Sequence, residues 1–192
     1  MFIRSERLFL RPGWPEDRED LLSQLCDTQV VRQLASGPWS DHISEEGLIT
    51  DVPQNDRYPH FFVTVPGAQG ARLVGTCWIA EGDGGMPELG FWFAREEWGK
   101  GYATEAVSAV LRLACTLGHR EVTARMFVDS PAADRVLRNV GFAPTGLVRP
   151  QYNIEQRAEV PALVYRCCLG AACNSDKVIG TDAGDGNSAR AA

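Results

Sequence analysis

The chain has 192 residues, of which 44% are hydrophobic and 23% are charged, the balance of a soluble protein with one ordinary domain. Its formal net charge of -6 excludes a general electrostatic attraction for nucleic acid or for anionic lipid. No run approaches the roughly 20 apolar residues that span a bilayer, and residues 1–7 carry charges where an export signal would be apolar. We therefore expect a cytoplasmic protein without nucleic-acid or membrane partners.

The first third of the chain predicts one strand followed by short helices. Residues 3–11 alternate imperfectly between polar and apolar side chains, as a strand does, and a Pro-Gly pair ends them. A proline opens the next helix, residues 15–26, whose leucines form an apolar stripe. Residues 27–59 contain short helical patterns, at 30–34 and 44–49, that glycine and proline interrupt.

The middle of the chain gives clearer patterns. Residues 60–65, 72–79 and 86–93 read as strands separated by glycine-rich turns, so they predict an antiparallel meander. Apolar residues then recur at helical spacing over residues 103–117, and Gly118 ends this helix.

The remaining pattern alternates strand and helix. Residues 122–128 predict a strand, and Ser130 followed by proline predicts the N-cap and first residue of a helix that ends at Gly141. The chain from residue 142 is irregular or strand, and residues 162–168 form a last strand. This order predicts a mixed α/β domain with a central sheet.

Composition sets the expected domain boundary. From Gly170 onward the residues are small and polar, so we expect one domain over residues 1–169 and a disordered tail over residues 170–192. The six cysteines lack the C-x-x-C spacing of metal sites, so we expect reduced thiols and no metal. They are Cys26, Cys77, Cys115, Cys167, Cys168 and Cys173.

Two glycines, Gly99 and Gly101, stand between a predicted strand and the long predicted helix. Glycines let the main chain approach a ligand, and the free N–H groups of a first helical turn suit a phosphate or pyrophosphate. The chain lacks the G-x-x-x-x-G-K-[ST] pattern of a P-loop. A dinucleotide fingerprint fails as well, because Thr104 occupies its third glycine position and the preceding strand belongs to a meander.

The whole pattern resembles the GCN5-related N-acetyltransferase (GNAT) superfamily, and within it the branch of the ribosomal-protein N-terminal acetyltransferases. The resemblance covers about residues 3–168 and is carried by three segments: residues 5–12, residues 86–106 and residues 136–142. The superfamily's usual Arg/Gln-x-x-Gly-x-Gly/Ala motif stands here as Trp98-x-x-Gly101-x-Ala103.

This resemblance implies a fold, a co-substrate and a binding site. The fold is a mostly antiparallel twisted sheet flanked by helices, in which splayed strands form the cofactor cleft. The co-substrate is acetyl-CoA, whose pantetheine arm would lie along the main chain of the strand before the loop and whose pyrophosphate would meet the loop's N–H groups. The residues expected to bind it are Phe91, Trp92, Phe93, Trp98, Gly99, Lys100, Gly101, Tyr102, Ala103, Thr104 and Ser130.

The catalytic candidates also follow from the resemblance. Glu88 stands where related enzymes carry a glutamate proposed as general base through water, and its alternative role is a solvated strand end. The branch usually has Asn-Pro-x-Ser where this chain has Ser130-Pro131-Ala132-Ala133. Ala133 therefore replaces the serine proposed to protonate the thiolate. Ser130 is a candidate for a pantetheine contact or for catalysis, and its alternative role is a helix cap.

We expect an acetyltransferase that transfers acetyl from acetyl-CoA to a primary amine, such as a protein N-terminus, in a ternary complex. The alternatives are transfer to a small amine (an antibiotic, polyamine or amino acid) or a non-catalytic acyl-CoA-binding domain. The protein is expected to be a monomer or a homodimer. Further candidates are Arg135 and Arg138 for the cofactor's 3′-phosphate and, on the acceptor side, Trp39, His42, Tyr58 and His60.

Overall fold

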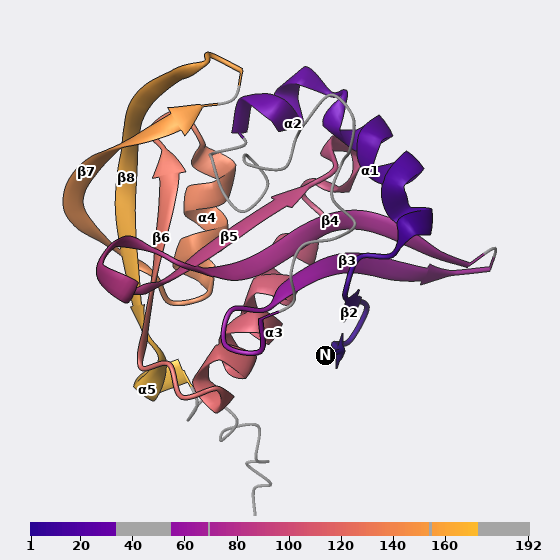
Figure 1. The fold of residues 1–192 in the computed structure, drawn as a ribbon, viewed down its shortest axis with the longest axis horizontal. Helices are drawn as coiled ribbons and strands as arrows, with labels where there is room; N and C mark the ends of the chain where they lie inside the picture. The colour runs from indigo at the N-terminus through magenta and orange to yellow at the C-terminus, as the bar shows by residue number, and fades with distance from the viewer. Residues whose placement is uncertain (34–54, 69, 154, 173–192) are drawn as a thin grey trace, which may run out of the picture.

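The computed structural model of the protein describes residues 1–33, 55–68, 70–153 and 155–172. Eight strands form one open sheet in the order β1-β2-β3-β4-β5-β6-β8-β7 (Figure 1). Every neighbouring pair is antiparallel except β5 and β6, which are parallel. This mixed sheet confirms the predicted fold class.

The element boundaries are as follows. The strands are β1 (Ile3–Arg4), β2 (Phe9–Arg11), β3 (His60–Gly67), β4 (Gly70–Glu81), β5 (Pro87–Phe93), β6 (Glu121–Phe127), β7 (Ala143–Asn153) and β8 (Ala158–Cys168). The α-helices are α1 (Arg18–Leu25), α2 (Thr28–Gln33), α3 (Tyr102–Thr116), α4 (Pro131–Asn139) and α5 (Leu169–Ala172). The 3-10 helices are η1 (Pro15–Asp17), η2 (Asp83–Gly85) and η3 (Arg95–Glu97).

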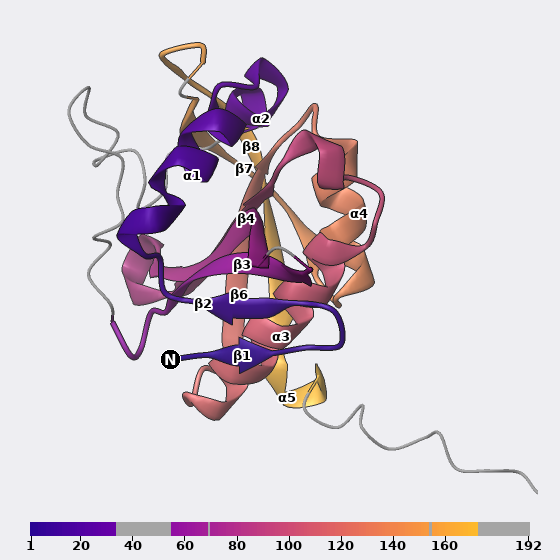
Figure 2. The same ribbon diagram turned by 90° about the vertical axis from the view of Figure 1, so that its right-hand side faces the viewer.

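Helices cover both faces of the sheet. Figure 2 shows α1 and α2 on one face and α3 and α4 on the other. The larger core lies on the α3 and α4 face, with Val107 and Leu137 among its buried residues. The smaller core on the opposite face contains Leu21 of α1, Val30 of α2 and Trp92 of β5. The sheet therefore separates two packed layers, and β5 contributes to both.

The prediction of one strand over residues 3–11 is wrong. Two short strands, β1 and β2, pair with each other, with Ile3 opposite Leu10. The main-chain N–H of Ser5 donates to Leu8 O at 3.0 Å, and the Leu8 N–H donates to Ser5 Oγ at 3.2 Å. A serine side chain thus closes a turn in place of continued extension, which explains the imperfect alternation.

The rest of the chain refines the predictions. The meander of β3, β4 and β5 is confirmed, and the chain after Phe142 forms the long antiparallel pair β7 and β8. Helix α5 extends past residue 169, where the sequence placed the end of the domain. The helix predicted at 44–49 and residues 173–192 lie outside the described part of the chain.

The cysteines correct one expectation. Cys26, Cys77, Cys167 and Cys168 are free thiols, as predicted. Cys115 is disulfide-bonded, so the prediction of a reduced thiol is wrong for that residue. Sequence spacing does not show which cysteines a fold brings together, and this is why the error arose.

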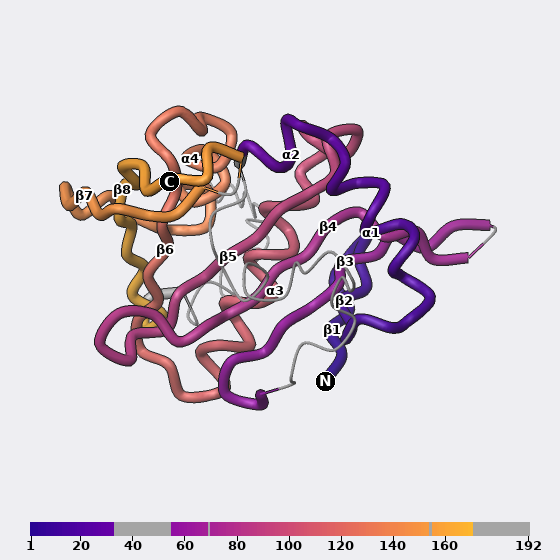
Figure 3. The backbone as a smooth tube through the Cα atoms, turned by 45° about the horizontal axis from the view of Figure 1, so that its top comes forward, coloured from indigo at the N-terminus to yellow at the C-terminus, as the bar shows by residue number. Residues whose placement is uncertain are grey.

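The sheet opens between β5 and β6. Their parallel ladder has two residue pairs, Glu88 with Thr123 and Leu89 with Ala124. Beyond these pairs β5 stays bonded to β4 as far as Phe93, and β6 stays bonded to β8 as far as Phe127, so the two strands diverge (Figure 3). This divergence confirms the predicted splayed strands.

A glycine lets β5 lie against an indole at the point of divergence. Gly90 pairs with Trp78 on β4, and a Cβ at Gly90 would lie 2.2 Å from the Trp78 ring. We predict that Gly90→Ala destabilises the protein by about 1–3 kcal/mol, because the buried ring must move to make room. Urea unfolding at equilibrium measures this change.

Gly170→Ala is the control for that prediction. Apart from its chain neighbours and the main chain of its own helix, no described residue has a heavy atom within 4 Å of a Cβ built at Gly170. Its stability should stay within about 0.5 kcal/mol of the unsubstituted protein. Equal stability of the two variants would show that the Trp78 contact does not restrict position 90.

Candidate functional site

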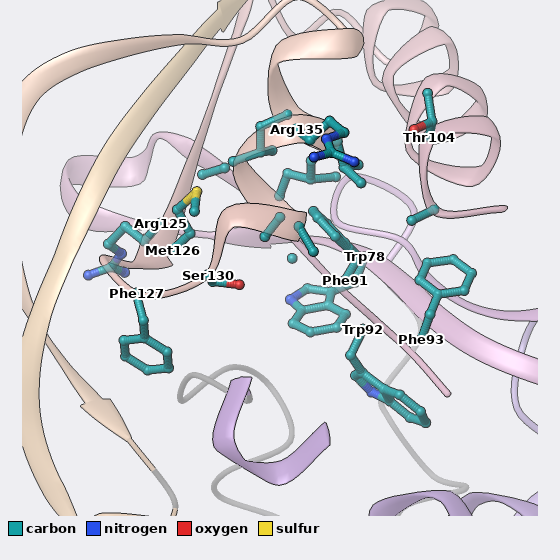
Figure 4. Close-up of a pocket in the computed structure, with 18 of the residues that line it drawn as sticks. Trp78, Phe91, Trp92, Phe93, Thr104, Arg125, Met126, Phe127, Ser130 and Arg135 are labelled. Atoms are coloured by element: carbon teal, nitrogen blue, oxygen red, sulfur yellow. The ribbon is translucent and has the colours of Figure 1, made fainter. Parts of the chain in front are cut away.

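A cavity of about 700 Å³ occupies the gap between the diverging strands. Its walls come from β5, β6, the segment before α3 and the first turns of α4 (Figure 4). Residues of both sheet faces line it, including Trp78 and Val30 on the α1 and α2 side and Val136 and Leu137 on the α4 side. The cavity therefore extends from one face of the sheet to the other.

The segment before α3 forms one end of this cavity. Gly99 and Gly101 have φ angles of 77° and 81°, a left-handed conformation that glycine adopts most easily. No side chain caps α3, and helix geometry leaves the N–H groups of its first residues without intrahelical acceptors. The Trp98 indole N–H donates to Phe93 O at 2.8 Å and ties this segment to the end of β5. The result is a group of main-chain donors at the positive end of a helix dipole, which suits an anion.

The structure brings the predicted site residues together. Every one of them except Lys100 lines the cavity: Glu88, Phe91, Trp92, Phe93, Trp98, Gly99, Gly101, Tyr102, Ala103, Thr104 and Ser130. The Lys100 ammonium instead lies 3.1 Å from the Glu97 carboxylate, so it is already paired within the protein.

Glu97 is a buried carboxylate beside the glycine segment, with 3% of its surface exposed. It accepts hydrogen bonds from Arg72 and from Lys100. Burial opposes its charge, but these two cations outweigh that effect and hold the pKa of Glu97 below its usual value. Glu97 therefore stays ionised, joining the glycine segment to β4 through Arg72.

Glu88 forms a two-pronged ion pair with Arg125. Arg125 Nε donates to Glu88 Oε1 at 2.9 Å, and Arg125 Nη2 lies 2.8 Å from Glu88 Oε2. Burial disfavours the charge of Arg125, but Glu88 and then Asp83 outweigh this effect and raise the pKa of Arg125. Glu88 is thus more than the solvated strand end that was its alternative: both carboxylate oxygens are engaged at the cavity wall.

Ser130 does not act as a helix cap. It occupies the N-cap position of α4, but its side chain makes no capping hydrogen bond. Ser130 is 4% exposed, and its hydroxyl has no hydrogen-bond partner among the described residues. The hydroxyl points into the cavity (Figure 4). A buried hydroxyl without a partner is unfavourable unless a ligand or water satisfies it, so this position favours a binding role.

The remaining candidates from the sequence lie in different environments. Arg135 lines the cavity, whereas Arg138 donates to Asp134 at 2.7 Å. His60 is buried against Phe62 and Trp78, and this burial lowers its pKa to about 3, so His60 is neutral and structural.

On the expected acceptor side, Tyr58 packs against His119, with ring centroids 5.7 Å apart. Neither Tyr58 nor His60 is part of the cavity wall. Trp39 and His42 lie outside the described residues.

Sequence reasoning missed three residues that shape the site: Trp78, Glu97 and Arg125. Trp78 and Arg125 line the cavity because of strand register. Trp78 on β4 lies opposite Gly90 on β5. Thr123 on β6 pairs with Glu88, and Arg125 follows Thr123 by two positions. No local pattern gives a register, but strand alternation would have placed Arg125 and Glu88 on one face once their strands were known to be neighbours.

Comparison with known proteins agrees with this arrangement. The family model described as "Acetyltransferase (GNAT) domain" matches residues 7–143. The chain belongs to the GNAT acetyltransferase family. It is an acyltransferase, as predicted.

The relatives of this GNAT acetyltransferase are distant in sequence. An uncharacterised N-acetyltransferase of Bacillus licheniformis is 26% identical over 153 residues, which cover 77% of this chain and 85% of the relative. A GNAT-family acetyltransferase from Bacillus anthracis superposes with a TM-score of 0.69 at 21% identity, covering 88% of this chain and 99% of that one. RimJ of Mycobacterium smegmatis, solved with CoA-disulfide, gives 0.65 at 18% identity, covering 85% and 83%.

Two further observations concern metals and membranes. Within the described ranges, the acetyltransferase has no group of three or more histidine, cysteine, aspartate or glutamate side chains placed to hold a metal ion. No helix in the same part of the chain is long and apolar enough to cross a membrane.

The lowered pKa of Glu97 predicts a pH-dependent contribution to stability. Its stabilisation is complete above the unfolded pKa of about 4.3 and is lost as the pH falls through the lower folded value. We predict that Glu97→Gln costs about 2 kcal/mol at neutral pH, since hydrogen bonds to a charged group are lost. The difference from the unsubstituted protein should begin to shrink as the pH falls below about 4.3 and should vanish once the pH is below the folded pKa of Glu97, where both side chains are neutral.

Urea unfolding at a series of pH values measures this effect. Glu96→Gln is the control, because the neighbouring Glu96 side chain is 73% exposed and forms a looser ion pair with Arg72, at 3.8 Å. An exposed pair of this kind contributes between about 0 and 1 kcal/mol. A loss in Glu97→Gln that does not vary with pH would contradict the assigned charge.

Proposed function

We propose that this GNAT protein is an acetyl-CoA-dependent N-acetyltransferase that acts on a primary amine, with a protein N-terminus as the preferred class of acceptor. The observation that carries the proposal is the continuous cavity. It begins at the uncapped N-terminus of α3, passes through the gap between β5 and β6 and reaches Glu88. An anionic cofactor end and an amine can therefore occupy opposite ends of one cavity.

The residues present fit acetyl-CoA. The main-chain N–H groups from Gly99 to Thr104 would hold the pyrophosphate. Trp92 forms a pair with Thr76 on β4, and because antiparallel bonding alternates, the main-chain groups of Trp92 are directed at β4 while those of Phe91 face the gap. We therefore assign the pantetheine contact to Phe91, with the Phe93 carbonyl already accepting from Trp98.

Trp92 has a different role in this proposal from the main-chain contact that the sequence suggested. It would contribute its indole to the cavity wall, where 5% of its surface is exposed. The partnerless Ser130 hydroxyl would satisfy its hydrogen bond on the same cofactor arm.

Acetyl-CoA supplies an activated acetyl group as a thioester. The amine nitrogen forms a bond to the acetyl carbon, the carbon–sulfur bond breaks, and the proton lost by the amine balances the one gained by the thiolate. Holding both reactants in one cavity supplies much of the rate. We assign to Ser130 the delivery of a proton to sulfur, since the related serine position is Ala133 and cannot donate; the hydroxyl then regains, through solvent water, the proton that the amine releases.

The ion pair between Glu88 and Arg125 affects which class of amine the enzyme can use as acceptor. Both Glu88 carboxylate oxygens are already engaged by the Arg125 guanidinium, so an acceptor amine that loses its proton easily suits this site best. An α-amine has an ordinary pKa of about 7.7–8.0, against about 10.4 for lysine. This difference favours a protein N-terminus over a lysine side chain. Glu88 would orient the amine or an intervening water.

Calorimetric titration tests the proposal directly. We predict saturable binding of acetyl-CoA and of CoA at one site per chain, since one cavity carries the anion-binding end. A panel of acceptors then follows, and peptides with free N-termini should give a higher kcat/KM than polyamines or free amino acids. Higher kcat/KM for a small amine would transfer the proposal to that acceptor class, and absence of cofactor binding would end it.

Substitution of Ser130 tests its assigned role. We predict that Ser130→Ala lowers kcat by about a hundredfold, as loss of a proton donor does. Ala133→Ser in the same chain should restore part of that loss, because it places a hydroxyl one helical turn further along α4 on the same cavity wall. Ala143→Ser is the control, because Ala143 is exposed and lies outside the cavity wall, and it should leave the loss in place. Unchanged kcat in Ser130→Ala would remove Ser130 from the chemistry.

A further inference from the structure

The turn between β1 and β2 contacts the segment that would bind the pyrophosphate. Arg7, in this turn, donates from Nη1 to Lys100 O at 3.0 Å and from Nε to Glu105 Oε2 at 2.8 Å. Its guanidinium carbon lies 4.9 Å from the centroid of the Tyr102 ring. A Cβ built at Gly101 would lie 3.3 Å from Arg7 Nη2. One side chain therefore contacts Lys100 and Tyr102, on either side of Gly101, although it lies 93 residues before Lys100 in the sequence.

Glu105 is the second member of this arrangement. It lies in the first turn of α3, next to the main-chain donors described above. Its Oε1 accepts from the Arg7 main-chain N–H and from the Ser5 hydroxyl, each at 2.7 Å. Burial opposes the charge of Glu105, but these hydrogen bonds and the Arg7 guanidinium outweigh it and lower the pKa of Glu105. A full negative charge therefore stands beside a site for an anion.

An uncompensated carboxylate at that position would repel a pyrophosphate. At 0.1 M salt the Debye length is about 10 Å, so two like charges within one helical turn are only partly screened from each other. The Arg7 guanidinium neutralises the carboxylate, and its hydrogen bond to Lys100 O orients the peptide that precedes Gly101. Both effects act on the anion site, and neither requires Arg7 to contact the cofactor.

We propose that Arg7 is a positioning residue for the cofactor: it holds the Gly99–Tyr102 main chain in its anion-binding conformation and cancels the charge of Glu105. The proposal rests on the function proposed above, since it assumes that this segment binds the pyrophosphate of CoA. It differs from a plain structural brace, because a brace would affect every ligand of the cavity equally.

Arg7→Met is the first test, because methionine keeps an apolar stem against Tyr102 and removes the charge and the donors. CoA and pantetheine, which lacks the pyrophosphate, are titrated separately against the full chain, with tryptophan fluorescence as the readout because Trp92 and Trp98 line the cavity. We expect the Kd for CoA to rise about tenfold in Arg7→Met, while the Kd for pantetheine changes less than about twofold. Raising the salt from about 0.01 M to 1 M should reduce the CoA deficit, since repulsion by Glu105 is then screened.

Glu105→Gln tests the negative charge of Glu105 separately from the hydrogen bonds that hold the turn. Its amide oxygen can still accept from the Ser5 hydroxyl and the Arg7 N–H, so the turn is kept. We expect it to bind CoA at least as tightly as the unsubstituted protein, and to recover about threefold of the affinity lost in Arg7→Met when the two are combined. Arg112→Met, an exposed arginine on the same helix, is the control and should change neither Kd.

The outcomes separate the two levels of the proposal. If the unsubstituted protein does not bind CoA, the proposed function and this inference both fall. If it binds CoA and Arg7→Met binds it equally well, or loses CoA and pantetheine to the same extent, only the positioning role is overturned. Thermal unfolding shows whether Arg7→Met is folded. Should it not fold, weaker CoA binding by Glu105→Gln alone would still overturn the proposal.

Discussion

The parallel ladder between β5 and β6 ends after two residue pairs because each strand continues with a different antiparallel neighbour. Main-chain bonding holds β5 to β4 and β6 to β8, so in the described part of the chain no further strand pairing closes the space between them. Side chains of moderate size, Phe91 and Met126 among them, line this space without filling it. The cavity is therefore a product of sheet topology. Changes in individual side chains would alter its shape more readily than remove it.

Charge pairing gives the site a second common property. In a chain with a net charge of -6, three of the glutamates at or beside the cavity are matched by cations: Glu88 by Arg125, Glu97 by Arg72 and Lys100, and Glu105 by Arg7. The charges of these three carboxylates are thus balanced within the protein. The dipole of α3 remains as the unbalanced field at the loop, which is the condition for binding an anion there.

Local sequence patterns predicted what depends on local structure. Residues within a few positions of each other predicted strand β5, the glycine segment after it and the start of α3. They also predicted that Ser130 stands at the start of a helix. The first strand was predicted wrongly because a single side chain, Ser5, closes a turn that composition does not reveal.

The partners of the charged residues could not be predicted. Arg7 and Glu105 are 98 residues apart in sequence, and Arg125 and Glu88 are 37 apart, so their pairing depends on strand order and register. The same limit applies to the hydroxyl of Ser130. Its sequence position predicts a cap, and only the course of the chain around the cavity turns it away from the helix.

The long sequence separation between Arg7 and Glu105 also has a consequence for folding. Contacts between distant residues form only after the loop entropy of the intervening chain has been overcome, so they are slow to appear compared with helices and hairpins. The start of α3 can become helical early, but its loop gains the Arg7 contacts only when the N-terminal turn docks. Competence to bind an anion is then acquired late, with the completed sheet. A ligand bound at the loop would in turn stabilise the docked N-terminal turn against local opening.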